Sequence, residues 1–211
     1  MRTRLLPTMT IQSIIFDLDG TLTTVPSPWR HIHERLGVWE DTASSFLNQW
    51  LAGEIPYEEF CRRDFELWAG HDVREIEGLL DEIEINSHVP EIVQRLREEK
   101  IPSFIISSGF SYIAHKIRDE HQWEPLEIYA NDLADGPEVR IRVSADFDSP
   151  ISKRRLADKI FESTGVDPDR TLVVSDSERD LEMLSQCGHQ LLVEAERDLS
   201  KVHEFIGRGR P

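Results

Sequence analysis

The sequence predicts an α/β fold, a parallel sheet interrupted after its first strand by a helical insert. The apolar run at residues 14–16 is typical of a buried parallel strand. Apolar residues then recur with helical spacing across residues 28–85. From residue 89 onward, helical and strand patterns alternate. Such alternation is typical of a parallel sheet with helices on its faces.

The insert accommodates four helices. Pro28 stands at a favourable first helical position, and Asp72 is suited to cap the fourth helix. The insert also holds four of the five tryptophans, Trp29, Trp39, Trp50 and Trp68. We interpret them as the core of a small bundle, with the alternative that one or two line a ligand cavity.

The second half of the chain supplies the remaining strands and helices. Strands are predicted at 103–106, 126–130, 171–174 and 190–193, a half-exposed hairpin strand at 139–143, and helices at 90–99, 110–121, 152–164, after 180 and at the C-terminal end. We expect a core of residues 11–25 and 88–207, a helical insert of residues 26–87, and flexible tails at 1–10 and 208–211.

Composition narrows the classes of partner. Forty acidic against 24 basic residues give a net charge of −16, which repels nucleic acid and anionic lipid. No apolar run approaches the length of a membrane span. The cysteines, Cys61 and Cys187, form no CxxC pattern, so we expect buried thiols and a reducing cytoplasm.

Polar residues gather at the predicted carboxyl ends of three strands, where open α/β sheets place their ligands. Taken alone, each group reads equally well as a polar loop, and the first as an ordinary Asp-Gly turn. Their coincidence, together with a lysine at a helix start, predicts a single site. The residues are Asp17, Asp19, Ser107, Ser108, Gly109, Lys153, Asp176 and Asp180.

The carboxylates suit a hard divalent cation such as Mg²⁺. We expect Asp17 and Asp176 to be direct ligands. We expect Asp19 to contribute through its backbone carbonyl. Asp180 completes the set, either as a direct ligand or as a residue that contacts a ligand.

The remaining polar groups suit a phosphate. The Ser107 hydroxyl and the backbone N–H groups of Ser108 and Gly109 form an expected anion site at a helix start. Lys153 adds positive charge between phosphate and carboxylates, although a lone lysine at a helix start is more often a surface residue. Asp17 is then placed to attack phosphorus, and Asp19 to act as general acid and base.

These residues resemble the four motifs of the haloacid dehalogenase superfamily in order and spacing, over residues 11–195. The matching segments are Asp17-Leu18-Asp19-Gly20-Thr21-Leu22, Ser107-Ser108-Gly109-Phe110, Lys153 and Asp176-Ser177-Glu178-Arg179-Asp180-Leu181. The insert resembles the cap of the phosphoserine phosphatase-like branch, as does the segment 129–133. The resemblance implies a Mg²⁺-dependent phosphatase of Rossmann-like fold, acting on a small phosphorylated metabolite beneath a four-helix lid.

Three departures from that branch argue against phosphoserine as substrate. Pro26 replaces an acidic residue that meets the substrate amine, and Asp64 falls where an arginine meets the carboxylate, although Arg62 and Arg63 are adjacent. Arg179 replaces an asparagine of the last motif. Four basic side chains are candidates for binding another anionic group, with surface solvation as the alternative for each: Arg30, His31, Arg62 and Arg179.

Two other functions stay open at this stage. A phosphotransferase would pass the phosphoryl group to an acceptor other than water, and a regulatory module would bind phosphorylated ligands without turnover. The presence of both Asp17 and Asp19 argues against the second. Dehalogenation is disfavoured because it gives Asp19 and the metal carboxylates no task.

Overall fold

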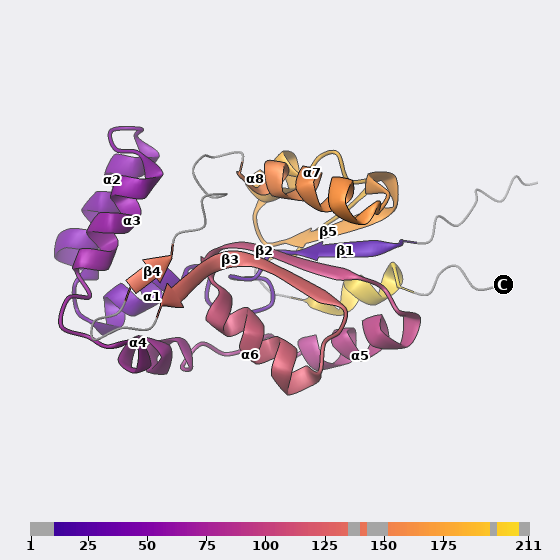
Figure 1. The fold of residues 1–211 in the computed structure, drawn as a ribbon, viewed down its shortest axis with the longest axis horizontal. Coiled ribbons are helices and arrows are strands. Elements are labelled where there is room, and N and C mark those ends of the chain that lie inside the picture. Colours follow the sequence, from indigo (N-terminus) through magenta and orange to yellow (C-terminus); the bar gives the residue numbers. More distant parts are fainter. Residues whose placement is uncertain (1–10, 135–139, 143–151, 195–197, 207–211) are drawn as a thin grey trace, which may run out of the picture.

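The sheet is the centre of the molecule. The computed structural model describes residues 11–134, 140–142, 152–194 and 198–206. Within these residues, six strands pair in the order β4-β3-β2-β1-β5-β6 (Figure 1). β4 runs antiparallel to β3, and the other neighbours are parallel. The predicted parallel sheet and its hairpin strand are therefore confirmed.

The strands begin and end close to the predicted positions, with two extensions, one of which carries the strand expected at 126–130 on to Ala134. They are β1 (Ser13–Phe16), β2 (Ser103–Phe110), β3 (Leu126–Ala134), β4 (Arg140–Arg142), β5 (Thr171–Ser175) and β6 (His189–Leu192). The prediction ended β2 at residue 106, before a turn. Instead β2 continues through a register irregularity and pairs Phe110 with Asn131 of β3.

Eight α-helices are described. They are α1 (Pro28–Arg35), α2 (Ser44–Leu51), α3 (Tyr57–Glu66), α4 (Val73–Leu80), α5 (Val89–Glu99), α6 (Ser111–His121), α7 (Ser152–Thr164) and α8 (Glu178–Met183). Pro28 lies in the first turn of α1, and Asp72 forms a capping box with Glu75 at α4. A π-helical turn, Trp39–Ala43, precedes α2. The predicted C-terminal helix is a six-residue 3₁₀ helix, Leu199–Glu204. None of the described helices is long and apolar enough to cross a membrane.

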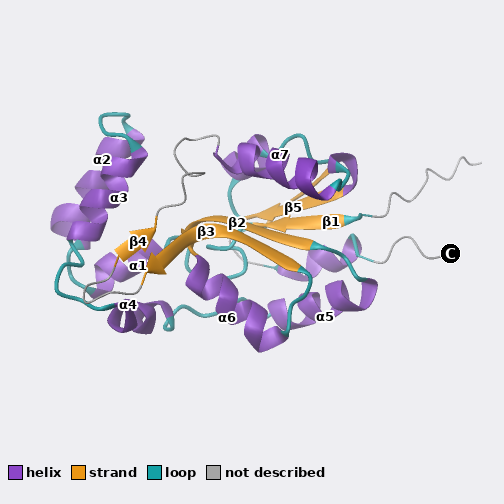
Figure 2. Cartoon of the chain, in the orientation of Figure 1, coloured by secondary structure: helices purple, strands orange, loops and turns teal. Residues whose placement is uncertain are grey.

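The alternation of side chains along the strands builds two apolar layers. Ile14 and Phe16 of β1 join one buried cluster, which includes Ile92 of α5 and Ile113 of α6. Ile15 joins a second cluster with residues of α7. Figure 2 shows α5 and α6 on one side of the sheet and α7 on the other. Because β1 is buried on both faces, the residue after it is held rigidly.

The helices of the insert lie beyond the carboxyl ends of the strands, with α2 and α3 farthest from the sheet (Figure 1). Its aromatic residues continue the core instead of forming a separate one. The Trp29 and Phe110 ring centroids are 4.7 Å apart, and Trp68 packs against both rings. Cys61 and Cys187 are buried free thiols, as expected.

The two segments that connect core and insert run side by side. Thr23 and Ile85 form an isolated antiparallel bridge, and the Asn86 amide nitrogen donates to the Leu22 carbonyl over 2.9 Å. This pairing lies close to the predicted boundaries after residues 25 and 87. The division into core and cap stays a prediction.

Candidate active site

A cavity of about 290 Å³ opens between the carboxyl edge of the sheet and the insert. Most of the predicted site residues line it, namely Asp17, Asp19, Ser108, Gly109, Lys153, Asp176 and Asp180. Ser107 is fully buried behind this wall. The cavity lies where β1, β2 and β5 end, the position at which parallel α/β sheets bind their ligands.

Asp17 and Lys153 form a buried ion pair at the base of the cavity. Lys153 Nζ donates to Asp17 Oδ1 over 2.7 Å and also pairs with Asp180. Burial raises the pKa of Asp17 to about 6 against the attraction of Lys153, with the charges of Asp180 and Asp176 adding to the rise. Burial lowers the pKa of Lys153, but its two carboxylate partners outweigh this and raise it overall. The ammonium therefore stays charged.

Asp19 lies next to Asp17 in a different environment. Ser107 Oγ donates to Asp19 Oδ2 over 2.5 Å, while Asp19 Oδ1 is buried without a hydrogen-bond partner. Burial, followed by the Asp17 charge, raises the pKa of Asp19 to about 7. A carboxyl group with such a pKa can hold a proton near neutrality and release it.

The segment after Ile106 differs from the predicted anion site. Ser107, Ser108 and Gly109 lie within β2, and α6 begins only at Ser111. The Gly109 amide nitrogen donates to Ser107 Oγ over 2.8 Å. The Gly109 amide therefore orients the Ser107 hydroxyl, which in turn donates to Asp19.

Two glycines leave room for the carboxylates. A Cβ on Gly109 would overlap the Asp19 carboxylate and lie 2.9 Å from Pro28 Cγ. Gly20 has a φ of +78°, and a Cβ there would overlap the Asp176 carboxylate. Both positions therefore require glycine for close approach, and Gly20 also for its backbone conformation.

The end of β5 is tied to the first motif. The Asp176 amide nitrogen donates to Thr21 Oγ1 over 2.9 Å. Ser175 Oγ donates to Asp180 Oδ2 over 3.2 Å. The carboxylates that follow β1 and β5 are thereby fixed relative to each other, and Thr21 gains a positioning role that the sequence did not reveal.

The donor set matches a hard cation in its chemistry. Three carboxylates, Asp17, Asp176 and Asp180, line one cavity. Asp19 Oδ1 lacks a partner. In the part of the chain that the structure describes, however, no three acidic, His or Cys side chains are arranged to hold a metal ion. Lys153 pairs with two of the carboxylates instead.

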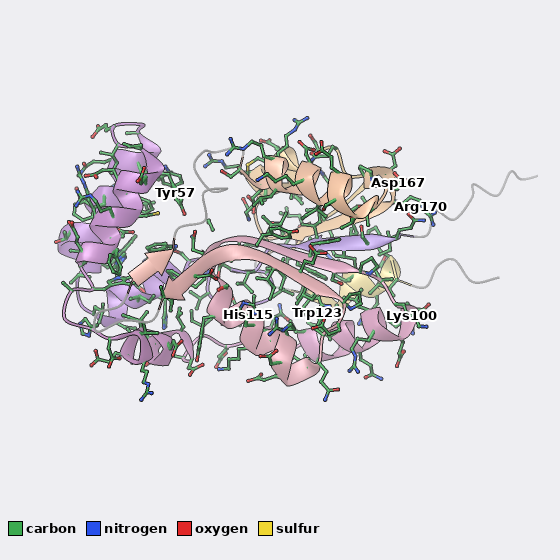
Figure 3. The ribbon with its side chains drawn as sticks, in the orientation of Figure 1. Tyr57, Lys100, His115, Trp123, Asp167 and Arg170 are labelled. Atoms are coloured by element: carbon green, nitrogen blue, oxygen red, sulfur yellow. The ribbon has the colours of Figure 1, made fainter. Side chains whose placement is uncertain are left out.

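The insert contributes an aromatic wall to the cavity, in which only Tyr57 had no expected place. Trp29, Trp50 and Tyr57 line the cavity. Figure 3 shows Tyr57 on the side of α3 that faces the core. The open alternative for the tryptophans is therefore confirmed for two of them, whereas Trp68 is fully buried. Helical periodicity alone does not distinguish a buried face from a cavity wall.

Asn131 of β3 is a second residue without a predicted role. Its Nδ2 donates to the Ser108 carbonyl over 2.8 Å, and Trp29 Nε1 donates to the same oxygen over 3.1 Å. The Tyr57 hydroxyl also hydrogen-bonds to Asn131. Asn131 thus joins the insert to the end of β2. The resemblance of segment 129–133 was the available signal, without a function attached.

Of the four basic residues considered for anion binding, one lines the cavity and three do not. Only Arg179 lines the cavity. Arg30 pairs with Glu34, Arg62 pairs with Glu59, and His31 Nε2 lies 3.0 Å from the Leu79 carbonyl oxygen. Pro26 lines the cavity, whereas Asp64 is buried elsewhere in the insert.

The fold and the cavity together define an α/β protein with an acidic site beneath a helical insert. The chain belongs to the haloacid dehalogenase-like hydrolase family, whose model matches residues 14–185. The predicted membership is confirmed.

Relatives and solved structures give a consistent result. The phosphoserine phosphatase of Archaeoglobus fulgidus is 24% identical over 90% of this chain and 54% of its own length. That of Idiomarina loihiensis is 23% identical over 91% of this chain and 86% of its own. The chain thus spans about half the length of the first relative.

The structural likeness extends over nearly the whole chain. A substrate-bound phosphoserine phosphatase complex superposes with a TM-score of 0.74 and 18% identity, covering 93% of this chain and 99% of that one. A phospho-aspartyl intermediate analogue of phosphoserine phosphatase gives 0.73 and 19%, with the same coverage. At these identities the likeness concerns the fold.

Proposed function

We propose that the protein is a Mg²⁺-dependent phosphatase that hydrolyses a small phosphomonoester through a phosphoryl group carried on Asp17. The observation that carries the proposal is the convergence of Asp17, Asp19 and Lys153 on one cavity, with Ser107 bonded to Asp19. Membership of a hydrolase family and relatives named phosphoserine phosphatase support the same chemistry.

Two displacements at phosphorus make up the reaction. An Asp17 oxygen forms a bond to phosphorus as the ester P–O bond breaks, and Asp19 gives its proton to the departing oxygen. Asp19 then takes a proton from water, whose oxygen attacks phosphorus as the bond to Asp17 breaks. Phosphate and alcohol are released, and both carboxyl groups return to their starting states.

The surroundings support this division of roles. Asp17 lies beside the Lys153 ammonium, which keeps it ionised for attack and offsets phosphate charge. Asp19 has no cation within hydrogen-bond distance among its described contacts and is held by a hydroxyl. Unequal environments of neighbouring carboxyl groups are what separates nucleophile from acid in such pairs.

Mg²⁺ would be held by the Asp17 and Asp176 carboxylates and the Asp19 carbonyl, with Asp180 nearby. When bound, the ion neutralises phosphate charge and orients the phosphoryl group. Binding requires Lys153 to share Asp17 and Asp180 with the cation, because it pairs with both.

The test uses acetyl phosphate and p-nitrophenyl phosphate with and without Mg²⁺. We expect turnover that EDTA abolishes and Mg²⁺ restores, and that Asp17→Asn lowers by at least about a thousandfold. Asp119→Asn, a change on the exposed surface of α6, serves as the matched control. Metal-independent turnover or full activity of Asp17→Asn would contradict the proposal.

Product analysis separates hydrolysis from transfer. With added alcohols, a phosphatase releases inorganic phosphate in an amount equal to the substrate consumed. A phosphotransferase instead yields new phosphate esters. Binding of phosphorylated compounds without turnover in every condition would identify a regulatory module.

A further inference from the structure

The wall of the cavity opposite the acidic residues points to the class of substrate. Resting on the proposed phosphatase activity, we propose that the alcohol released is apolar or aromatic and carries neither an ammonium nor a carboxylate group. The substrate is then the phosphate monoester of a small apolar alcohol rather than a phosphorylated amino acid.

Charge is distributed unequally around the cavity. Among the residues that the structure describes, the charged ones lining the cavity come from the core, at the ends of β1 and β5, the start of α7 and within α8. The residues contributed by the insert carry no charge: Pro26, Ser27, Pro28, Trp29, Trp50 and Tyr57. Phosphate therefore binds at the core, and the rest of the substrate faces the insert.

Two of the three aromatic side chains of the wall have their polar atoms engaged by protein groups. Trp29 Nε1 is engaged by the Ser108 carbonyl, and the Tyr57 hydroxyl by Asn131 and Cys61. Trp50 stacks on Phe60, with ring centroids 5.3 Å apart, and packs against Tyr57, with ring centroids 5.7 Å apart. Rings packed in this way form a preorganised apolar surface, and such surfaces bind planar or branched hydrocarbon groups.

A zwitterionic substrate finds no partner of opposite charge among the described residues of this wall. Its ammonium would need a carboxylate beyond those at the phosphate, and Asp64 is buried away from the cavity. Its carboxylate would need a cation, but Arg62 and Arg63 both pair with Glu59 outside the cavity. Burying a charge without a partner carries a large free-energy cost.

Arg179 is a cation in the cavity lining that could in principle pair with a substrate carboxylate. It lines the cavity from α8, but its residue is exposed to solvent. An exposed arginine at a rim contributes less binding energy than a buried one, since water screens its charge. The cavity volume of about 290 Å³ lies at the lower end of ligand sites, which favours a single ring or a short branched chain.

The decisive comparison uses three alkyl esters of phosphate. 3,3-Dimethylbutyl phosphate and phosphocholine have the same shape and differ in a neutral carbon against a cationic nitrogen, and phosphoserine adds the zwitterion. We expect kcat/KM for the neutral ester to exceed both others by at least about tenfold. A preference for phosphocholine would instead indicate cation binding by the rings. A preference for phosphoserine that Arg179→Ala removes would also overturn the proposal.

Variants of the wall test the same claim within one protein. Trp50→Leu is expected to lower the ratio of kcat/KM for dimethylbutyl phosphate to that for phosphoserine by about tenfold. Trp39→Leu is the matched control, since Trp39 belongs to the insert but does not line the cavity. Circular dichroism confirms folding of both variants. An unchanged ratio in Trp50→Leu would contradict the assignment.

A binding measurement separates this proposal from the chemistry. Calorimetric titration with 3,3-dimethylbutylphosphonate and with the phosphonate analogue of phosphoserine reports preference without turnover. If acetyl phosphate is not hydrolysed, the phosphatase proposal fails, yet tighter binding of the apolar phosphonate still supports the wall assignment. Equal or weaker binding of the apolar phosphonate contradicts it.

Discussion

Asp17 and Asp19 are the same amino acid two positions apart, and their neighbours give them different environments. Lys153 pairs with Asp17, whereas a serine hydroxyl holds Asp19. The sequence was sufficient to nominate all four residues, because they follow predicted strands or begin a predicted helix. It did not reveal that Ser107 bonds to Asp19, since that contact joins residues 88 positions apart in the sequence.

The role of Asp19 can be tested by removing its proton. Asn in place of Asp19 retains the shape but cannot act as acid or base, so we expect kcat for alkyl phosphates to fall about 10²- to 10⁴-fold. With p-nitrophenyl phosphate, whose leaving group needs no proton, a burst of one nitrophenolate per enzyme should precede slow turnover. Rapid-mixing kinetics measures both. Wild-type rates on alkyl esters would contradict the role.

The absence of a side chain at Gly109 leaves room for the Asp19 carboxylate, and a substitution tests whether activity requires that room. Because an added Cβ would overlap the Asp19 carboxylate, Gly109→Ala should displace that group and lower kcat by at least about a hundredfold. Gly78→Ala on α4 is the control, since nothing lies within 4 Å of its added Cβ. There we expect unchanged activity and about 0.5–1 kcal/mol of added stability. Steady-state kinetics and thermal unfolding distinguish the two, and full activity of Gly109→Ala would exclude the steric argument.

At the scale of elements, the pattern was predictable because the central strands β1 and β5 are short apolar runs and most helices bury one apolar face. The exceptions have local causes. β2 extends past residue 106 because Phe110 pairs with Asn131, a contact between strands that periodicity does not encode. The last helix is 3₁₀, and its six residues are too short for propensity to decide the type.

The Ser108 carbonyl is an element-level junction, since it accepts from β3 through Asn131 and from α1 through Trp29. Asn131→Ala removes one donor and also the core partner of the Tyr57 hydroxyl. We expect kcat/KM to fall at least about tenfold, with about 1–3 kcal/mol lost in the free energy of unfolding. Trp29→Phe, which removes only one donor and keeps a ring, should lose less in both. Kinetics and urea unfolding provide the test, and a larger effect from Trp29→Phe would reverse this ranking.

For the whole molecule, the helical insert after the first strand was predictable from the sequence, but the side of the insert that lines the cavity was not. Helix faces can be assigned to a core or to a cavity only once the helices are placed against the sheet. Trp68 and Trp50 illustrate this, because both fit helical spacing, yet one is fully buried and the other lines the cavity.

The insert also makes stability depend on pH. Burial raises the pKa of Asp64 to about 8, and its Oδ1 has no hydrogen-bond partner. Nearby, burial lowers the pKa of His33 to about 4, and its Nε2 lies 3.5 Å from the Asp64 carbonyl oxygen. Folded Asp64 keeps a proton that the unfolded chain releases above about pH 4, so its contribution to stability is full below that pH and is lost as pH rises to about 8. The His33 contribution is full above about pH 6.5 and is lost as pH falls through 4.

Between about pH 4 and 6.5, a rise in pH lowers the unfolding free energy through Asp64 and raises it through His33. Above that range, of the two, only Asp64 changes the unfolding free energy. Replacing Asp64 with Asn removes its titration and leaves His33 in place. The difference in unfolding free energy between wild type and Asp64→Asn should therefore move against the wild type by roughly 1.4 kcal/mol per pH unit between about pH 5 and 7.5. Urea unfolding of both proteins across this range measures the difference, and the same comparison for Asp119→Asn should be flat. A pH-independent difference for Asp64→Asn would mean that this carboxyl is ionised in the folded insert, with a cation or water reaching it.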